Sequence, residues 1–173
     1  DDVVFFFFYF YLAIALCEQY DMRFVEGGKT RSISIANGLD YIKEHYPNVE
    51  KIIVFDSARP FVKSYLISEY MDFLDEYDGV ITTCAITDSL GDYENNNINR
   101  DNYYLIQAPE AFKFRVIYEY FDRNSSITSM VQQLPVGSNI YQFFDFPNNM
   151  KITYHDDLEI ARVLMSSKED DEE

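Results

Sequence analysis

Short apolar runs alternate along this chain with stretches whose apolar residues recur at helical spacing, and this alternation constrains the fold more than any other feature. The predicted strands are 3–10, 51–55 and 79–86. The predicted helices are 32–46, 64–77 and 156–165. Each predicted strand is a continuous apolar run, which is typical of strands buried on both faces. We therefore expect an α/β protein with a mainly parallel central sheet and helices on both faces.

The first predicted strand opens a run of almost unbroken apolar residues, from Val3 to Leu16. A membrane-spanning helix needs about 20 such residues. A secretory signal would begin with basic residues, whereas this chain begins with Asp1 and Asp2. The run therefore predicts a buried strand that leads into a helix, and no membrane segment.

Composition limits the classes of function. The chain has 173 residues, of which 47% are hydrophobic, and this suffices for one core, so we expect a single domain over residues 1–166. The net charge of −16 disfavours nucleic acid and anionic membranes as partners. Cys17 and Cys84 lie far apart and without metal-ligand spacing, which favours a reducing, cytoplasmic compartment.

Two segments depart from the α/β pattern. Residues 88–101 are polar and rich in asparagine, and the aromatic pair Tyr103 and Tyr104 follows them. This excursion is either a solvated loop or a protruding β-arm, over about 88–109, that packs on a second copy of the chain. Residues 167–173 form a mainly acidic run without an apolar anchor, which predicts a frayed tail.

Three clusters combine small or turn-forming residues with charges where strands should end, which is the edge at which α/β sheets bind ligands. In the first cluster, Gly27 and Gly28 allow the backbone to approach a ligand closely, and the helix that begins near Ser32 can receive anionic atoms at its N-terminus. The same residues are also compatible with an ordinary loop and a helix cap.

The other two clusters carry single charges. Asp56 ends an apolar strand, where a carboxylate suits Mg²⁺. Arg59 can either hold a phosphate or lock its loop through a salt bridge. Lys151, beside two asparagines, can either neutralise charge on a phosphate during a reaction or be an ordinary surface lysine.

Five strings, in this order along the chain, resemble those of one family, the cytidylyltransferases that join CTP to a polyol phosphate. The strings are GGKTRSISIANGL, VFDSARPFV, AITDSL, NRDNYYLIQAPEAF and MKITYHDDLEIA. The resemblance spans roughly residues 26–164 and implies a Rossmann-like nucleotidyltransferase fold. The two best-known branches of the family act on 2-C-methyl-D-erythritol 4-phosphate, in isoprenoid biosynthesis, and on ribitol 5-phosphate, in wall polymer synthesis.

The resemblance also implies roles for individual residues. Lys151 matches a lysine that stabilises the pentavalent phosphorus, Asp56 the aspartate that binds the cofactor Mg²⁺, and Arg59 the catalytic arginine beside it. The residues implied to contact CTP are Gly28, Ser34, Ser57 and Ala58. The residues implied to contact the polyol phosphate are Ser89 and Arg100. Because the arginine matched by Arg100 serves a neighbouring subunit, the resemblance implies a homodimer that uses segment 88–109 as its arm.

The implied reaction is in-line attack of a polyol phosphate oxygen on the α-phosphorus of CTP, with release of pyrophosphate. TRSISIANGL favours the methylerythritol branch, whereas Asn99, Arg100, Asp101 and Tyr104 lean towards the ribitol branch. The family's opening strand and glycine-rich loop, with the first catalytic lysine, have no counterpart in this sequence. We expect the sequence to be part of a longer enzyme, and the alternative is a non-catalytic binding or scaffold subunit.

Overall fold

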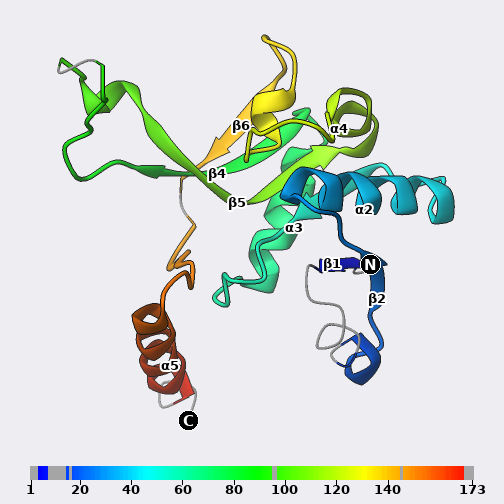
Figure 1. Ribbon diagram of the computed structural model, residues 1–173, viewed down its shortest axis with the longest axis horizontal. Helices are drawn as coiled ribbons and strands as arrows, with labels where there is room; N and C mark the ends of the chain where they lie inside the picture. The colour runs from blue at the N-terminus through cyan, green and yellow to red at the C-terminus, as the bar shows by residue number, and fades with distance from the viewer. Residues whose placement is uncertain (1–3, 8–14, 16, 95–96, 145, 170–173) are drawn as a thin grey trace. The chain divides into compact units, whose positions relative to one another are not determined.

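The structure is a computed structural model that describes residues 4–7, 15, 17–94, 97–144 and 146–169. The chain forms two compact units, one made of residues 1–52 and 112–139 and the other of 53–111 and 140–173. Figure 1 shows the helices and strands of both units. No helix within the described ranges is long and apolar enough to cross a membrane.

The first unit contains a parallel strand pair followed by a long helix. β1 (Val4–Phe7) pairs with β2 (Arg23–Glu26) in parallel. α2 (Arg31–His45) begins after Thr30, whose side-chain oxygen accepts a hydrogen bond from the backbone nitrogen of Ile33 at 3.2 Å. This N-cap satisfies a backbone donor that the helix itself leaves unpaired. The unit also contains α4 (Phe114–Tyr120) and the short 3-10 helix η2 (Val131–Gln133).

A four-stranded sheet has the strand order β3-β5-β4-β6. Its strands are β3 (Lys51–Val54), β4 (Gly79–Ala85), β5 (Tyr104–Lys113) and β6 (Ile140–Phe143). β4 and β6 are parallel, with Gly79 opposite Ile140, but the sheet as a whole is mixed. In the described chain between the neighbours β4 and β5 the only helix is the 3-10 helix η1 (Arg100–Asn102), whereas parallel neighbours are usually joined through an α-helix.

The second unit is held together by an aromatic and aliphatic core beneath α3 (Ser64–Phe73). The buried members of this core are Leu66, Tyr70, Leu74, Val80, Ala111 and Phe143. The Thr82 hydroxyl donates to the backbone oxygen of Pro109 at 2.8 Å and lies 2.6 Å from the Tyr70 hydroxyl. Because a threonine has a single hydroxyl proton, Tyr70 donates to Thr82. Burial raises the pKa of Tyr70 above its ordinary value, so the phenol remains a donor.

The expected α/β class is confirmed, with a sheet that is mixed. β3, β4 and α2 lie within one residue of the predicted ranges at each end, and α3 ends four residues early, at Phe73. Of the first predicted strand, residues 4–7 form β1, and residues 3 and 8–10 lie outside the described ones. α5 (His155–Glu169) continues into the predicted tail, of which residues 170–173 are not described.

Candidate functional site

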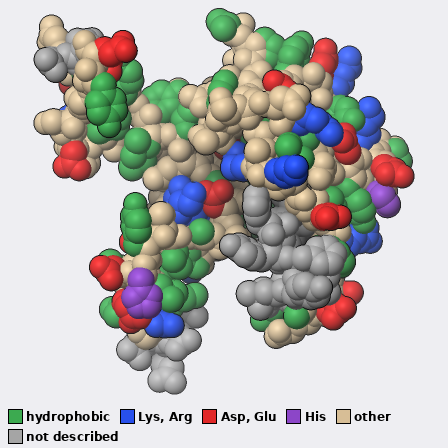
Figure 2. Space-filling model, viewed as in Figure 1, with side chains coloured by type: hydrophobic (Ala, Val, Ile, Leu, Met, Phe, Trp, Pro, Cys, Tyr) green, Lys and Arg blue, Asp and Glu red, His purple; other side chains and the backbone are tan. Residues whose placement is uncertain are grey.

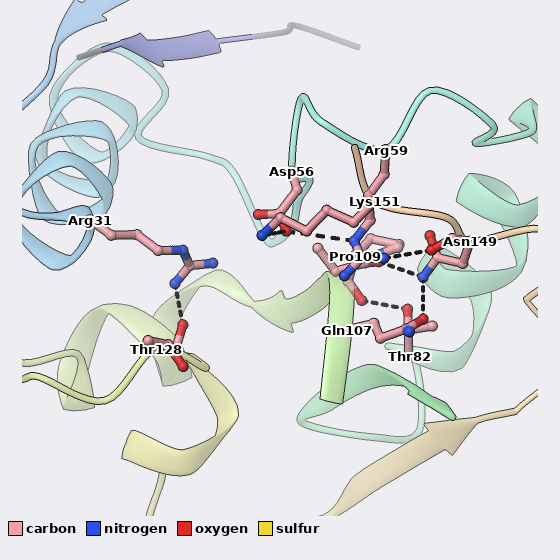
Figure 3. A network of polar contacts seen from close by, with 10 residues as sticks. Arg31, Asp56, Arg59, Thr82, Gln107, Pro109, Thr128, Asn149 and Lys151 are labelled. Carbon is pink, nitrogen blue, oxygen red and sulfur yellow. Dashed lines mark hydrogen bonds and ion pairs between the residues drawn. The ribbon is translucent and has the colours of Figure 1, made fainter. Parts of the chain in front are cut away.

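An acidic side chain and two basic ones meet beyond the end of β3 in the second unit (Figure 3). The Nζ atom of Lys151 lies 3.1 Å from Oδ2 of Asp56. The Nε atom of Arg59 lies 3.6 Å from the same oxygen. Asp56 follows β3 by two residues, so the strand places it at the edge of the sheet, as the sequence predicted. The structure therefore brings the three predicted catalytic residues together.

The side chain of Arg59 is largely covered and is bonded to the protein. Its side chain is 9% exposed, and its guanidinium donates to the backbone oxygen of Asn149 at 2.5 Å. Burial lowers the pKa of Arg59 from its ordinary value, while the charge and hydrogen bonding of Asp56 act in the opposite direction. Of the two roles left open for Arg59, this geometry favours the locking of the loop, and its catalytic role stays a prediction.

Lys151 differs from Arg59 in being accessible. Its side chain is 48% exposed, so the ammonium group can meet an incoming phosphate while it keeps Asp56 as a partner. The backbone on either side is fixed, because the Asn149 oxygen accepts from Arg59 and the Ile152 nitrogen donates to the Ala58 oxygen at 2.8 Å. The lysine thus projects from a segment joined on both sides to the Asp56–Arg59 turn.

Asn149 is a member of this network to which the sequence assigned no role. Its Nδ2 atom donates to Oε1 of Gln107 at 2.8 Å and to the backbone oxygen of Ala108 at 2.9 Å. The sequence indicated only a turn at this position, because the pair Asn148 and Asn149 precedes Lys151. The positive φ of Asn148, 49°, agrees with that turn. Nothing in the local pattern indicates that Asn149 contacts the distant segment at Gln107.

The predicted CTP-binding residues Gly28 and Ser34 lie together in the first unit. The backbone nitrogen of Gly28 donates to the Ser34 hydroxyl oxygen at 2.9 Å, and that hydroxyl donates to the Thr30 oxygen at 3.0 Å. A Cβ atom on Gly28 would lie 2.0 Å from Cγ2 of Ile33, so only glycine fits here. Gly28 is therefore held against the start of α2, while its contact with CTP stays a prediction.

The start of α2 also holds a second loop of the first unit. The guanidinium of Arg31 donates to the backbone oxygen of Thr128 (Figure 3), and the Ser32 hydroxyl donates to the Ser125 oxygen at 2.8 Å. These bonds use the side chains of the TRS string to order the loop that precedes η2. No local pattern predicts that a loop nearly a hundred residues away lies at this position.

The remaining predicted residues also lie in the second unit. Ser57 is exposed next to Asp56, and Ala58 is partly buried. Ser89 is exposed after β4. Arg100 donates to the backbone oxygen of Thr87, and its Nε atom lies 3.9 Å from the Asp101 carboxylate. The predicted contacts of these residues with CTP or a polyol phosphate stay predictions.

The donor set at Asp56 fits a metal ion that is shared with a phosphate. Within the described residues, no group of three or more His, Cys, Asp and Glu side chains forms a metal-binding cluster. Mg²⁺ is commonly bound through one or two carboxylates, with phosphate oxygens and water completing its octahedron. Asp56, with its side chain 22% exposed, can supply one such carboxylate.

Local positive charge accompanies the overall negative charge of the chain. The sequence has a net charge of −16, yet Figure 2 shows Lys and Arg side chains among the acidic ones on the face in view. A local group of cations can bind an anionic ligand because nearby charges dominate the local potential. Lys151 and Arg59, on either side of Asp56, form such a group.

The mixed α/β fold, with its charged cluster at the end of a strand, is similar to that of nucleotidyltransferases. The model of the 2-C-methyl-D-erythritol 4-phosphate cytidylyltransferase (IspD) family matches residues 11–167, and the chain belongs to this family. The family suggested by the five strings is thereby confirmed.

Individual relatives agree with this assignment. The chain is 29% identical over 147 residues to the 2-C-methyl-D-erythritol 4-phosphate cytidylyltransferase of Thermosipho melanesiensis, covering 79% of this chain and 64% of that protein. It is 31% identical over 158 residues to the enzyme of the same name from Clostridium tetani, covering 83% and 61% respectively. The chain thus spans less than two thirds of the length of these two relatives.

A solved structure is also similar. The 4-diphosphocytidyl-2C-methyl-D-erythritol synthase of Anaerococcus prevotii superposes with a TM-score of 0.81 at 25% identity, covering 96% of this chain and 79% of that one.

Proposed function

We propose that the protein to which this chain belongs transfers CMP from CTP to 2-C-methyl-D-erythritol 4-phosphate and releases pyrophosphate. The carrying observation is that Asp56 and Lys151, in a chain of this family, lie 3.1 Å apart just beyond a strand end. An accessible ammonium group held beside a carboxylate suits a reaction in which negative charge grows on a phosphate.

The proposed reaction is an in-line displacement. An oxygen of the polyol phosphate forms a bond to the α-phosphorus of CTP, the bond from that phosphorus to the bridging oxygen breaks, and pyrophosphate leaves with the electron pair. Lys151 stabilises the charge on the pentavalent phosphorus. Arg59 holds the loop that carries Asp56, and Asp56 would hold Mg²⁺. When bound, the metal ion neutralises charge on the phosphate oxygens.

The same proposal includes the substrate contacts, the assembly and the compartment. Gly28 and Ser34, with Ser57 and Ala58, bind CTP, and Ser89 and Arg100 bind the polyol phosphate. The arm over about 88–109 joins two subunits into a homodimer. Its exposed apolar side chains, Tyr103, Tyr104 and Leu105, support this part. The two cysteines are free thiols, which is compatible with reaction in the cytoplasm.

Pyrophosphate release by the natural protein tests the proposal. CTP and Mg²⁺ are supplied with 2-C-methyl-D-erythritol 4-phosphate in one reaction and ribitol 5-phosphate in another. We expect release with the first substrate, and loss of release in the Asp56→Ala variant. Release with ribitol 5-phosphate alone would assign the other branch, and silence with both would favour a non-catalytic subunit.

A further inference from the structure

We propose that Asn149 is a positioning residue whose side-chain amide holds the segment of Lys151 so that the lysine faces Asp56. The inference rests on the proposed function, because it assigns a second residue to the action of Lys151. It concerns residues of the second unit only, and Figure 3 shows the network that carries it.

The side-chain amide of Asn149 uses both of its protons in hydrogen bonds. Nδ2 of Asn149 donates one to Oε1 of Gln107 at 2.8 Å and the other to the Ala108 oxygen at 2.9 Å. An aspartate of the same shape would have no proton to donate, a serine would have one, and an alanine none. Asparagine is thus the side chain of this length that satisfies both acceptors.

The backbone around Lys151 connects the amide of Asn149 with the lysine. The backbone oxygen of Asn149 accepts from Arg59, and the Ile152 nitrogen donates to the Ala58 oxygen. Lys151 lies between these two links, so the segment that carries it is joined both to the Asp56–Arg59 turn and, through Asn149, to the Gln107–Ala108 segment of β5. The side chain of Asn149 makes two hydrogen bonds to that strand.

The amide of Asn149 also has an oxygen atom without a partner. Oδ1 of Asn149 is buried and has no hydrogen-bond partner within the described structure. A buried polar atom without a partner costs free energy, and an apolar side chain would avoid that cost. The cost is understandable if the amide is needed for the position of its neighbour, since functional geometry is often retained at the expense of stability.

Kinetics with a double-mutant cycle test the inference. Asn149→Ala keeps the backbone oxygen that accepts from Arg59 and removes only the amide. A displacement of about 1 Å can cost on the order of 10²-fold in rate, so we expect kcat and kcat/KM to fall together by about this factor. In a Lys151→Ala background the same substitution should change kcat by less than about twofold, because the residue acts through the lysine. An equal loss in both backgrounds would overturn the inference.

Thr82→Val is the matched control. Thr82 donates to the oxygen of Pro109, the neighbour of Ala108, but its side chain lies within the core. This variant removes a buried hydrogen bond to the same segment, so it should lower the unfolding midpoint while kcat stays near the wild-type value. A loss of kcat in this variant equal to that of Asn149→Ala would also overturn the inference, because general loosening would then explain both.

Amide exchange provides a readout that does not require activity. The Ile152 N–H that bonds to Ala58 should exchange at least tenfold faster in Asn149→Ala, and at the wild-type rate in Thr82→Val under native conditions. If the natural protein releases no pyrophosphate, the proposed function fails, and the exchange rates still decide whether Asn149 holds this segment. Unchanged Ile152 exchange in Asn149→Ala would refute the positioning role.

Discussion

Replacement of Lys151 by alanine should separate catalysis from stability. The ammonium group lies 3.1 Å from Oδ2 of Asp56, and the lysine side chain is 48% exposed. Ion pairs exposed to this degree contribute about 0–1 kcal/mol to folding. Asp56 also keeps Arg59 at 3.6 Å after the change, so the carboxylate is not left alone. We therefore expect the free energy of unfolding to fall by less than about 1 kcal/mol, or roughly 2–4 °C in Tm.

The rate should respond far more strongly than the stability. Loss of one group that stabilises developing negative charge typically lowers kcat about 10²–10³-fold. The effect should appear equally in kcat and kcat/KM, because the interaction strengthens in the transition state. Pyrophosphate release measures the rate, and thermal or denaturant unfolding of the same samples measures the stability.

Arg162→Ala is a matched control for this experiment. Arg162 also forms an exposed ion pair, 2.5 Å from Glu159 on α5, and it has no place in the proposed reaction. It should change stability by a similarly small amount and leave kcat unaltered. The reasoning would be refuted if Lys151→Ala retained more than about a tenth of wild-type kcat. It would be refuted equally if Lys151→Ala lowered stability by several times the effect of the control.

Three further outcomes follow from the structure. Gly28→Ala should destabilise the protein by about 1–3 kcal/mol in denaturant unfolding, because the new Cβ would lie 2.5 Å from Cβ of Ile33, and an unchanged midpoint would contradict the close contact. Backbone hydrogen bonds from Tyr154 and Thr153 lower the pKa of Asp157 below its ordinary value of 3.8. Their stabilisation of the start of α5 is complete above that value and lost as the pH falls through the lowered pKa, so the Tyr154 amide should then exchange faster relative to its intrinsic rate. Asp157→Ala has no side-chain acceptor, so protection of this amide should be low at every pH and show no such change. Arg100→Ala should raise KM for the polyol phosphate in the pyrophosphate assay, and a change confined to KM for CTP would exclude the proposed contact.

The elements that the sequence predicted well are those with a strong local pattern. β3 and β4 are apolar runs bounded by polar residues, and α2 repeats its apolar residues at helical spacing, so burial and local preference agree. β5 was not predicted, because Gln107, Pro109 and Glu110 interrupt its apolar character. Proline lacks the backbone donor of a ladder and normally argues against a strand, so only the neighbouring strands explain this assignment.

In the candidate site, too, some residues could be predicted from local patterns and others could not. Asp56 and Lys151 could be singled out because each charge stands at a break between an apolar segment and a turn, and the surrounding strings are specific to one family. The role of Arg59 was open from the sequence, since an arginine can either hold a phosphate or lock its loop through a salt bridge. Its 9% exposure and its bond to Asn149 favour the second role.

Local sequence patterns therefore determined the α/β class, most of the strands and helices that carry the site, and the family. They could do so because periodicity, turn residues and short charged motifs act over a few neighbouring residues. Tertiary structure alone decided the mixed sheet, the insertion of β5 between β3 and β4, and the joining of Asn149 to Gln107 and Ala108. These features depend on pairing between segments that are distant in sequence. A buried amide shows its partners only after the chain has folded, because hydrogen bonding is decided by distance in space.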